Sequence, residues 1–264
     1  MTEQHVTVDR EGAIAILTLN RPEKRNALSL EMMRELERRL SELGEDRSIG
    51  AIVLRAQGPA FSAGHDLREL VEGSEENHRT VFEACVNLME RLTRVPQPVI
   101  AEVAGVATAA GCQLVAACDL AVASEKATFA TPGVRIGLFC STPMVALTRA
   151  VGRKRAMEML LTGEAIDART AFEWGLVNRV VAPERLHEET MALAARVTSA
   201  SRTIVGIGKA AFYRQIDLGA SDAYAYAKDV MIANASEDDA REGMGAFLDK
   251  RQPQWRGLSE RVET

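Results

Sequence analysis

The first half of the sequence repeats one local order: an apolar segment, a loop of small residues, and an amphipathic segment. β-Branched apolar runs at 13–19, 49–54 and 99–103 predict buried strands. Apolar residues recur at helical spacing over 29–43 and 79–94, which predicts helices. Since strand, loop and helix recur about three times by residue 125, the sequence predicts βα-type units forming successive turns of one spiral, an α/β fold.

The second half has a different, mostly helical pattern. A single strand is expected at 176–181, and no linker rich in Pro, Gly or Ser interrupts the chain. Helices are expected at 142–151, 153–161, 167–174 and 184–198, and throughout the segment beyond 203. We therefore expect a core of residues 1–200 followed by a helical region, residues 201–264, that packs against neighbouring subunits.

Composition excludes several classes of protein. A net charge of −5, with no long Lys/Arg run, argues against nucleic-acid binding. No apolar stretch is long enough to span a bilayer, so no membrane partner is expected. The four cysteines show no CxxC spacing and the four histidines are scattered, so no metal site or disulfide framework is predicted. Because the N-terminus lacks an apolar signal region, we expect a cytoplasmic protein.

Two small-residue loops, 57–67 and 104–111, each follow a predicted strand and open a helix. The first N–H groups of a helix have no partner inside it, so two such loops can direct two donors at one oxygen. That arrangement is an oxyanion hole, in which removing one donor typically costs roughly 3 kcal/mol. Small residues also permit tight packing of a helix on a sheet, and the loops alone leave both interpretations open.

Six segments resemble the enoyl-CoA hydratase/isomerase (crotonase) family, in order and across nearly the whole chain. The matching segments are Arg21 to Leu28 ("NRPxxxNAL"), Phe61 to Leu67 ("FxAGxD[IL]"), Gly105 to Asp119 ("GxxxGGGxxLxxxCD"), Phe129 to Gly137 ("FxxPExxxGxxP"), Ala165 to Val177 ("AxxAxxxGLV") and Glu242 to Arg251 ("EGxxAFxEKR"). The local segment around Phe139 resembles a subgroup, the enoyl-CoA hydratase domain-containing proteins. The resemblance implies a crotonase-like (ββα) spiral core with a C-terminal helical oligomerisation region, assembled as a homotrimer or a dimer of trimers.

The resemblance also assigns binding residues. It implies that the N–H groups of His65 and Ala110 form the oxyanion hole for a thioester carbonyl. It places coenzyme A, as part of the substrate rather than as a permanently bound cofactor, near Arg25, Ala27, Ala63, Asp66, Leu67, Ala109, Phe247 and Lys250.

The sequence departs from the family at two positions that carry acid/base chemistry. Hydratases of the family use two glutamates, and the corresponding positions here are Gln113 and Gly133. An amide can orient water but does not transfer protons at a useful pKa, and glycine can do neither. The sequence therefore predicts weak or atypical hydratase activity.

Other polar residues are candidates for the missing chemistry. His65 lies in a segment resembling the "SAGHD" variant of decarboxylases in the same superfamily, so its ring is either a proton donor or turned away with only its N–H engaged. Cys140 is either a nucleophile or weak acid, or a small buried apolar residue. Gln113 is expected to orient water or to bond backbone. Ser141 and Thr142 are expected to cap the next helix, and Thr131 to pack.

Three functions are consistent with these residues. The first is hydration or isomerisation of an enoyl-CoA by a family lyase. The second is decarboxylation of a malonyl-type CoA that uses His65, and the third is acyl-CoA binding without catalysis. A serine hydrolase is excluded because the sequence has no GxSxG motif.

Overall fold

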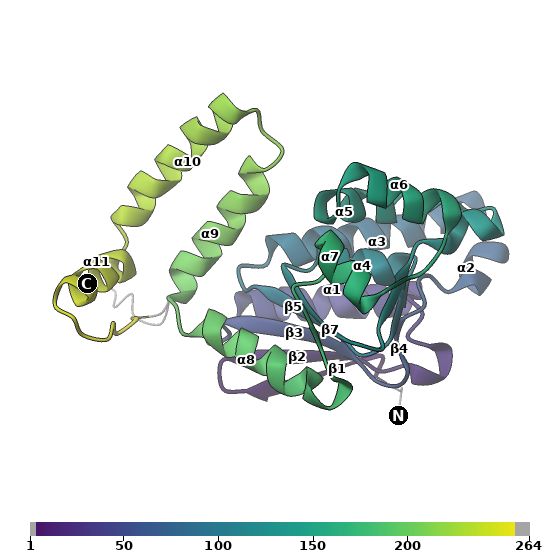
Figure 1. Ribbon diagram of the computed structural model, residues 1–264, viewed down its shortest axis with the longest axis horizontal. Helices are drawn as coiled ribbons and strands as arrows, with labels where there is room; N and C mark the ends of the chain where they lie inside the picture. The colour runs from purple at the N-terminus through teal and green to yellow at the C-terminus, as the bar shows by residue number, and fades with distance from the viewer. Residues whose placement is uncertain (1–3, 257–264) are drawn as a thin grey trace.

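A computed structural model describes residues 4–256 and arranges the strands in two sheets (Figure 1). The six-stranded sheet has the order β1 (Val6–Glu11), β2 (Ile14–Leu19), β3 (Ala51–Ala56), β5 (Val99–Val103), β7 (Leu120–Ser124) and β10 (Arg179–Val181). The four-stranded sheet has the order β4 (Ala60–Ser62), β6 (Val106–Thr108), β8 (Thr128–Ala130) and β9 (Ile166–Asp167). Neighbouring strands are parallel except in the pairs β1–β2 and β8–β9.

The two sheets are connected by a repeating unit. Each turn of the chain adds one strand to the larger sheet, one to the smaller sheet, and then a helix. The units are β3–β4 followed by α2 (Leu67–Val71) and α3 (Glu75–Arg94), β5–β6 followed by α4 (Ala110–Ala117), and β7–β8 followed by the 3-10 helix η2 (Pro132–Ile136) and α5 (Pro143–Ala150). The α/β spiral predicted from the sequence is confirmed.

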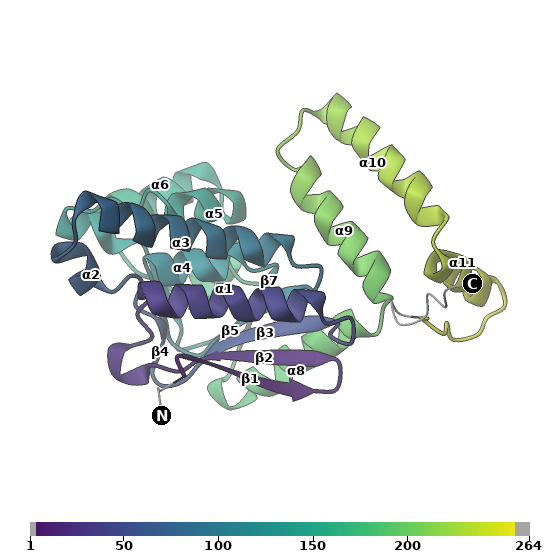
Figure 2. The ribbon, with the colours of Figure 1, turned by 180° about the vertical axis from the view of Figure 1, so that it is seen from behind.

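The larger sheet is covered on both faces. Helices α1 (Leu30–Glu45) and α3 cover one face (Figure 2), where Leu17, Leu54 and Leu88 are fully buried in the main core. Helix α8 (Leu186–Thr198) covers the other face, where Ala194 packs on alternate strand residues such as Val53. Since both faces are buried there, the central strands β2, β3 and β5 are mostly apolar rather than alternating, which is why their sequence signal is strong. The edge strand β1 is polar and mostly exposed.

The ends of two elements differ from the prediction. Helix α3 begins at Glu75 rather than 79, because the Ser74 hydroxyl accepts the Asn77 N–H and caps the preceding turn. The strand expected at 176–181 is shortened to β10, because the N–H groups of Leu176 and Val177 bond back to the Ala171 carbonyl at the end of α7 (Ala168–Trp174). Apolar residues there belong to a helix end, not to a strand.

The C-terminal part is helical as far as Leu248, as expected, apart from short connections. Residues 249–256 are not helical, and residues 257–264 of the expected helical region lie outside the described residues. Helices α9 (Arg202–Gln215) and α10 (Ala220–Ala235) form a hairpin that projects away from the sheets (Figure 1). Helix α11 (Asp238–Leu248) follows α10 at the open end of the hairpin, where Asp239 accepts a hydrogen bond from Ser201 at the start of α9. The remaining elements are η1 (Pro22–Lys24), α6 (Arg153–Thr162) and η3 (Pro183–Arg185). Within residues 4–256, no helix has both the length and the apolarity needed to cross a bilayer.

One buried ion pair connects the projecting hairpin to the core. The Lys209 ammonium of α9 donates to the carbonyls of Leu92 (2.7 Å) and Gln97 (2.9 Å) and to Asp119 Oδ2 (2.7 Å). Asp119 also accepts from the Tyr213 hydroxyl at 2.8 Å. Burial lowers the pKa of Lys209, and the Asp119 carboxylate opposes that shift. Every donor of the ammonium is therefore used to hold α9 against the core.

We expect Lys209→Met to destabilise the fold by about 3–5 kcal/mol, because it leaves the Asp119 carboxylate buried without its counter-ion. Lys228 forms an exposed pair with Asp229, so Lys228→Met should change the free energy of unfolding by less than about 0.5 kcal/mol. Urea denaturation followed by circular dichroism measures both values. Equal effects of the two substitutions would contradict a structural role for the buried pair.

Candidate functional site

The two small-residue loops lie against each other at the start of α2 and α4. Gly64 has φ 86°, and a Cβ placed on it would lie 2.9 Å from the Ala109 Cβ and 3.2 Å from the Ala110 nitrogen. A Cβ on Gly111 would lie 2.3 Å from the Ser62 carbonyl oxygen. Contacts this short leave room only for glycine. The loops that the sequence predicts as donor loops are therefore brought together.

The first loop is held in place by a buried asparagine. Asn26, with φ 50°, donates from Nδ2 to the carbonyls of Gln57 and Ala60, each at 2.8 Å. Its own carbonyl accepts from the Ser62 hydroxyl at 2.8 Å. Asn26 lies in the first motif that resembles the family, but no role for it is expected from the sequence; asparagine in a turn next to Pro22 was the available signal, because its side chain bonds nearby backbone groups.

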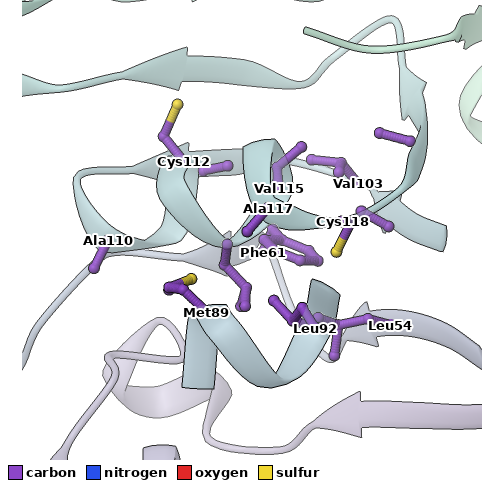
Figure 3. Packing of buried hydrophobic residues seen from close by; sticks show 14 of the residues in the cluster. Leu54, Phe61, Met89, Leu92, Val103, Ala110, Cys112, Val115, Ala117 and Cys118 are labelled. Atoms are coloured by element: carbon purple, nitrogen blue, oxygen red, sulfur yellow. The ribbon is translucent and has the colours of Figure 1, made fainter. Parts of the chain in front are cut away.

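The core beneath the loops fixes the position of α4. Phe61, which lies in β4 within the first loop segment, is buried under α4 (Figure 3). Figure 3 shows its ring between Met89 and Leu92 of α3 and the α4 side chain Val115. Rigid packing of this kind holds the helix start where its N–H groups face the adjacent loop.

Two backbone donors in these loops have no acceptor. The parallel bridge between Leu28 and His65 uses the Leu28 N–H, which donates to Gly64 at 2.7 Å, and the Asp66 N–H, which donates to Leu28 at 3.4 Å. The His65 N–H takes no part in it. Ala110 is the first residue of α4, where a helix supplies no acceptor. Neither the His65 nor the Ala110 N–H donates to any group in the described residues 4–256.

A cavity of about 580 Å³ opens at these donors. Its volume is within the range of small-molecule sites. Its wall is mostly apolar. The larger apolar residues that line it are Leu67, Leu70, Phe82, Pro132, Ile136, Leu138, Phe139 and Pro143. The titratable residues among its lining residues are His65, Arg135 and Cys140, and no described carboxylate lines it. The site therefore combines an apolar pocket with two donors and lacks a carboxylate for acid/base chemistry.

The His65 ring is held by a contact with Phe82. Its edge packs against Phe82 with 5.4 Å between ring centroids. Both ring nitrogens are shielded from solvent and have no hydrogen-bond partner among the described residues. Burial lowers the pKa of the ring, and the Leu28 backbone opposes the shift. The ring is therefore neutral near pH 7 and does not present a nitrogen to a bound substrate, unlike its backbone N–H.

Cys140 and Gly133 close one side of the cavity. A Cβ on Gly133 would lie 1.9 Å from the Leu138 carbonyl oxygen and 2.9 Å from Cys140 Sγ. The Leu138 N–H also donates to the Gly133 carbonyl at 2.9 Å. Burial raises the pKa of the Cys140 thiol, although the Gly133 backbone opposes the shift, so the thiol is protonated near neutrality. The segment 138–140 thus occupies the space that a side chain at position 133 would need.

Arg135 is a lining residue whose charged head has a structural partner. Its Nε donates to the Thr162 carbonyl at 2.8 Å, at the last residue of α6. A cation at the C-terminus of a helix is favourably placed. The guanidinium is therefore engaged outside the cavity.

Gln113 is not among the cavity-lining residues. Its side chain is buried between α3 and α4, where Oε1 accepts from Cys85 Sγ at 3.8 Å. Thr131 is fully buried and its hydroxyl has no hydrogen-bond partner within the described part of the chain. The water-orienting role of Gln113 stays a prediction.

The expectation that Ser141 and Thr142 cap α5 is wrong. Thr142 occupies the N-cap position but has helical backbone angles, and its side chain makes no capping hydrogen bond. Pro143 starts the helix, and the Met144 N–H donates to the Cys140 carbonyl at 3.0 Å instead. Because the backbone supplies this acceptor, no hydroxyl is needed.

The residues expected near coenzyme A fall into three groups. Ala63, Leu67 and Ala109 line the cavity. Arg25, Ala27 and Asp66 have structural roles beside the cavity. The Arg25 carbonyl accepts the Ala63 N–H at 3.0 Å, and Ala27 lies in the same hydrogen-bonded turn as Arg25. Asp66 caps α2 by accepting the Arg68 N–H at 3.1 Å. Phe247 lies in α11 and Lys250 just after it. In space, α11 and α2 are at opposite ends of the molecule (Figures 1 and 2). The structure does not bring Phe247 and Lys250 to the cavity of their own chain.

Fold and site together define a class of protein: an α/β spiral that presents two unpaired backbone donors to an apolar ligand cavity. The family model for Enoyl-CoA hydratase/isomerase matches residues 9–258. The chain belongs to the enoyl-CoA hydratase/isomerase family.

Relatives and solved structures agree with this assignment. The chain is 48% identical over 249 residues to enoyl-CoA hydratase domain-containing protein 3, mitochondrial, of Xenopus laevis, covering 94% of this chain and 85% of that protein. It is 35% identical to a probable enoyl-CoA hydratase of Rhizobium meliloti, covering 97% and 99%. The crystal structure of human enoyl-CoA hydratase domain-containing protein 3 aligns with a TM-score of 0.93 at 47% identity, covering 96% and 100%. An enoyl-CoA hydratase structure from Mycobacterium smegmatis aligns with the same TM-score at 50% identity, covering 96% and 99%.

The relatives confirm the predicted resemblance to the domain-containing subgroup and correct one expectation. Five relatives that are 46–50% identical to this chain are named mitochondrial. The expectation of a cytoplasmic protein is therefore contradicted.

We expect Gly64→Ala to destabilise the fold by about 1–3 kcal/mol, because the new Cβ meets the second loop at a backbone angle that suits glycine. The same shift should separate the two donors and weaken binding of butyryl-CoA at least tenfold in calorimetry. Gly208 lies in α9 with no atom near its Cβ position, so Gly208→Ala should stabilise by about 0.5–1 kcal/mol. Unchanged stability and affinity in Gly64→Ala would contradict the contact between the loops.

Ala109 is a non-glycine residue in a strained conformation, with φ 52° and ψ −119°. Ala109→Gly removes the steric cost of the Cβ, and we expect it to stabilise the protein by about 1 kcal/mol, net of the added freedom of the unfolded chain. Chemical denaturation measures the difference. A loss of stability would show that the Ala109 methyl contributes more through packing than it costs in strain.

Proposed function

We propose that this chain binds an acyl-CoA thioester and stabilises the enolate of that thioester. The observation that carries the proposal is the pair of unpaired N–H groups, His65 and Ala110, at one end of an apolar cavity. A thioester carbonyl oxygen gains negative charge as its enolate forms. Two fixed backbone donors stabilise that charge without having to move when the enolate forms. This electrostatic stabilisation is the principal contribution to lowering the reaction barrier.

The apolar wall suits the acyl group of such a substrate. Phe82, Ile136 and Leu138 offer hydrocarbon surface to an acyl chain, and each buried CH₂ contributes about 0.8 kcal/mol. Coenzyme A would leave the cavity past Ala63 and Leu67, near Arg25, as the family resemblance implies. Coenzyme A is then part of the substrate, and the proposal requires no permanently bound cofactor.

The lining residues favour one enolate reaction over others. Hydration and isomerisation of an enoyl-CoA, the reactions that the family name denotes, require a group that moves protons to or from the substrate, commonly a carboxylate. No described carboxylate lines this cavity. Decarboxylation of a malonyl-type CoA needs no base, because loss of CO₂ leaves its bonding electron pair as the enolate. We therefore propose decarboxylation as the reaction, in preference to hydration.

A homotrimer, or a dimer of trimers, is part of the proposal. The projecting helices carry exposed apolar side chains that a subunit contact would bury, among them Tyr224, Met231, Ile232 and Phe247. Phe247 is 83% exposed in the single chain. In such an assembly, Phe247 and Lys250 would lie beside a neighbouring subunit's cavity, where the Lys250 charge suits a CoA phosphate.

Steady-state assays on the wild-type protein test this function. Turnover of methylmalonyl-CoA to propionyl-CoA should be detectable, whereas hydration of crotonyl-CoA should be at least 10³-fold slower than turnover by a two-carboxylate hydratase, on the order of one lost acid/base group. Butyryl-CoA should bind in calorimetry. Robust crotonyl-CoA hydration would overturn the preference for decarboxylation, and binding without turnover of either ester would support an acyl-CoA-binding protein without catalysis.

A further inference from the structure

An enolate formed in this cavity must be protonated at its α-carbon before product can leave. The donor has to carry a proton near neutral pH and line the cavity. Its proton must also be free of structural hydrogen bonds. The cavity supplies a short set of candidates: the ring of His65, the guanidinium of Arg135, the thiol of Cys140, and three hydroxyl side chains.

His65 and Arg135 do not satisfy these conditions. Both ring nitrogens of His65 are shielded, and the ring is held edge-on to Phe82. The Arg135 guanidinium is bonded to the end of α6 and does not release its proton in proteins. The hydroxyls of Thr108, Ser141 and Thr142 bind their protons too tightly to act without a stronger acid behind them.

Cys140 satisfies all three. Its side chain is only 6% exposed and lines the cavity beside Gly133. Cys140 is a free cysteine, and its one contact that opposes the raised pKa is with the Gly133 backbone, which favours the thiolate and leaves the S–H proton to be donated. Its Sγ lies 2.9 Å from the point where a Cβ of residue 133 would start, so the thiol fills the space vacated by the missing side chain.

We propose that the Cys140 thiol is the proton donor to the α-carbon of the bound thioester enolate. The inference rests on the proposed function. In this step the enolate π pair forms the new C–H bond, the S–H bond breaks and leaves its pair on sulfur, and the thioester carbonyl re-forms. The thiolate then takes a proton from solvent. No electron is lost or gained, and no co-reactant is required.

The chemistry of the thiol suits this step. Burial keeps the sulfur protonated at neutral pH, so the proton is present when the enolate forms. A carbanion beside a thioester is far more basic than a thiolate, so transfer is downhill even from a weak acid. Conversely, a thiolate buried in apolar surroundings is disfavoured, which returns the group to its acid form after each turnover.

The test uses methylmalonyl-CoA in deuterated water, with the configuration of the deuterium at C2 of propionyl-CoA as the readout. A donor fixed on one wall delivers deuterium to one face, so the wild-type protein should give a single configuration. Cys140→Ala should lower kcat at least tenfold and give product of mixed configuration, because solvent then reaches both faces. Cys140→Ser should resemble Cys140→Ala. Butyryl-CoA affinity should change less than threefold in both variants.

One control variant separates this role from loss of structure. Cys85 is buried outside the cavity and its Sγ donates to Gln113, a bond that serine can also make, so Cys85→Ser should leave rate and configuration unchanged. A single configuration from Cys140→Ala at wild-type rate would overturn the proposal. Absence of turnover in the wild-type protein, with butyryl-CoA still bound, would instead overturn the proposed reaction.

Discussion

The close approach of two loops is the constraint on which the site depends. Gly64 lies within ordinary contact distance of Ala109 and Ala110 only because it has no side chain, and Asn26 fixes the loop that contains it. This contact brings two helix starts, far apart in sequence, to one point. The spiral supplies the geometry: parallel strands in both sheets place successive loops at the same edge. The donors are therefore a property of the fold, whereas the reaction depends on which side chains line the cavity.

A second constraint is the distribution of charge. The interior of the cavity has few charged groups, while ionic groups are used for structure elsewhere. Lys209 and Asp119 hold the C-terminal hairpin on the core, and Arg135 donates a hydrogen bond to the last residue of α6. Burial lowers the pKa of Lys209 for a structural reason, so a perturbed pKa alone does not mark a catalytic centre. A place in the wall of the cavity that holds the two unpaired donors is the better criterion, and together with an available proton it selects Cys140.

Much of the fold followed from the sequence because its strands are buried on both faces and its loops carry Gly and Pro. The donor loops were also predictable, since each joins a strand to a helix start. Element ends at Glu75 and Leu176 were not, because a cap or a backbone bond sets them. Side-chain direction was the least predictable feature. No pattern indicates that the His65 ring turns towards Phe82, or that Gln113 lies between two helices instead of in the cavity.

The packing around Gly133 has a consequence for how this site can change over time. A carboxylate cannot be introduced at position 133 by one substitution, because the Leu138 carbonyl already stands where the new Cβ would be. The segment 138–140 would first have to move outward. Two-carboxylate chemistry is therefore accessible to this site only through coordinated changes in that segment and at position 133.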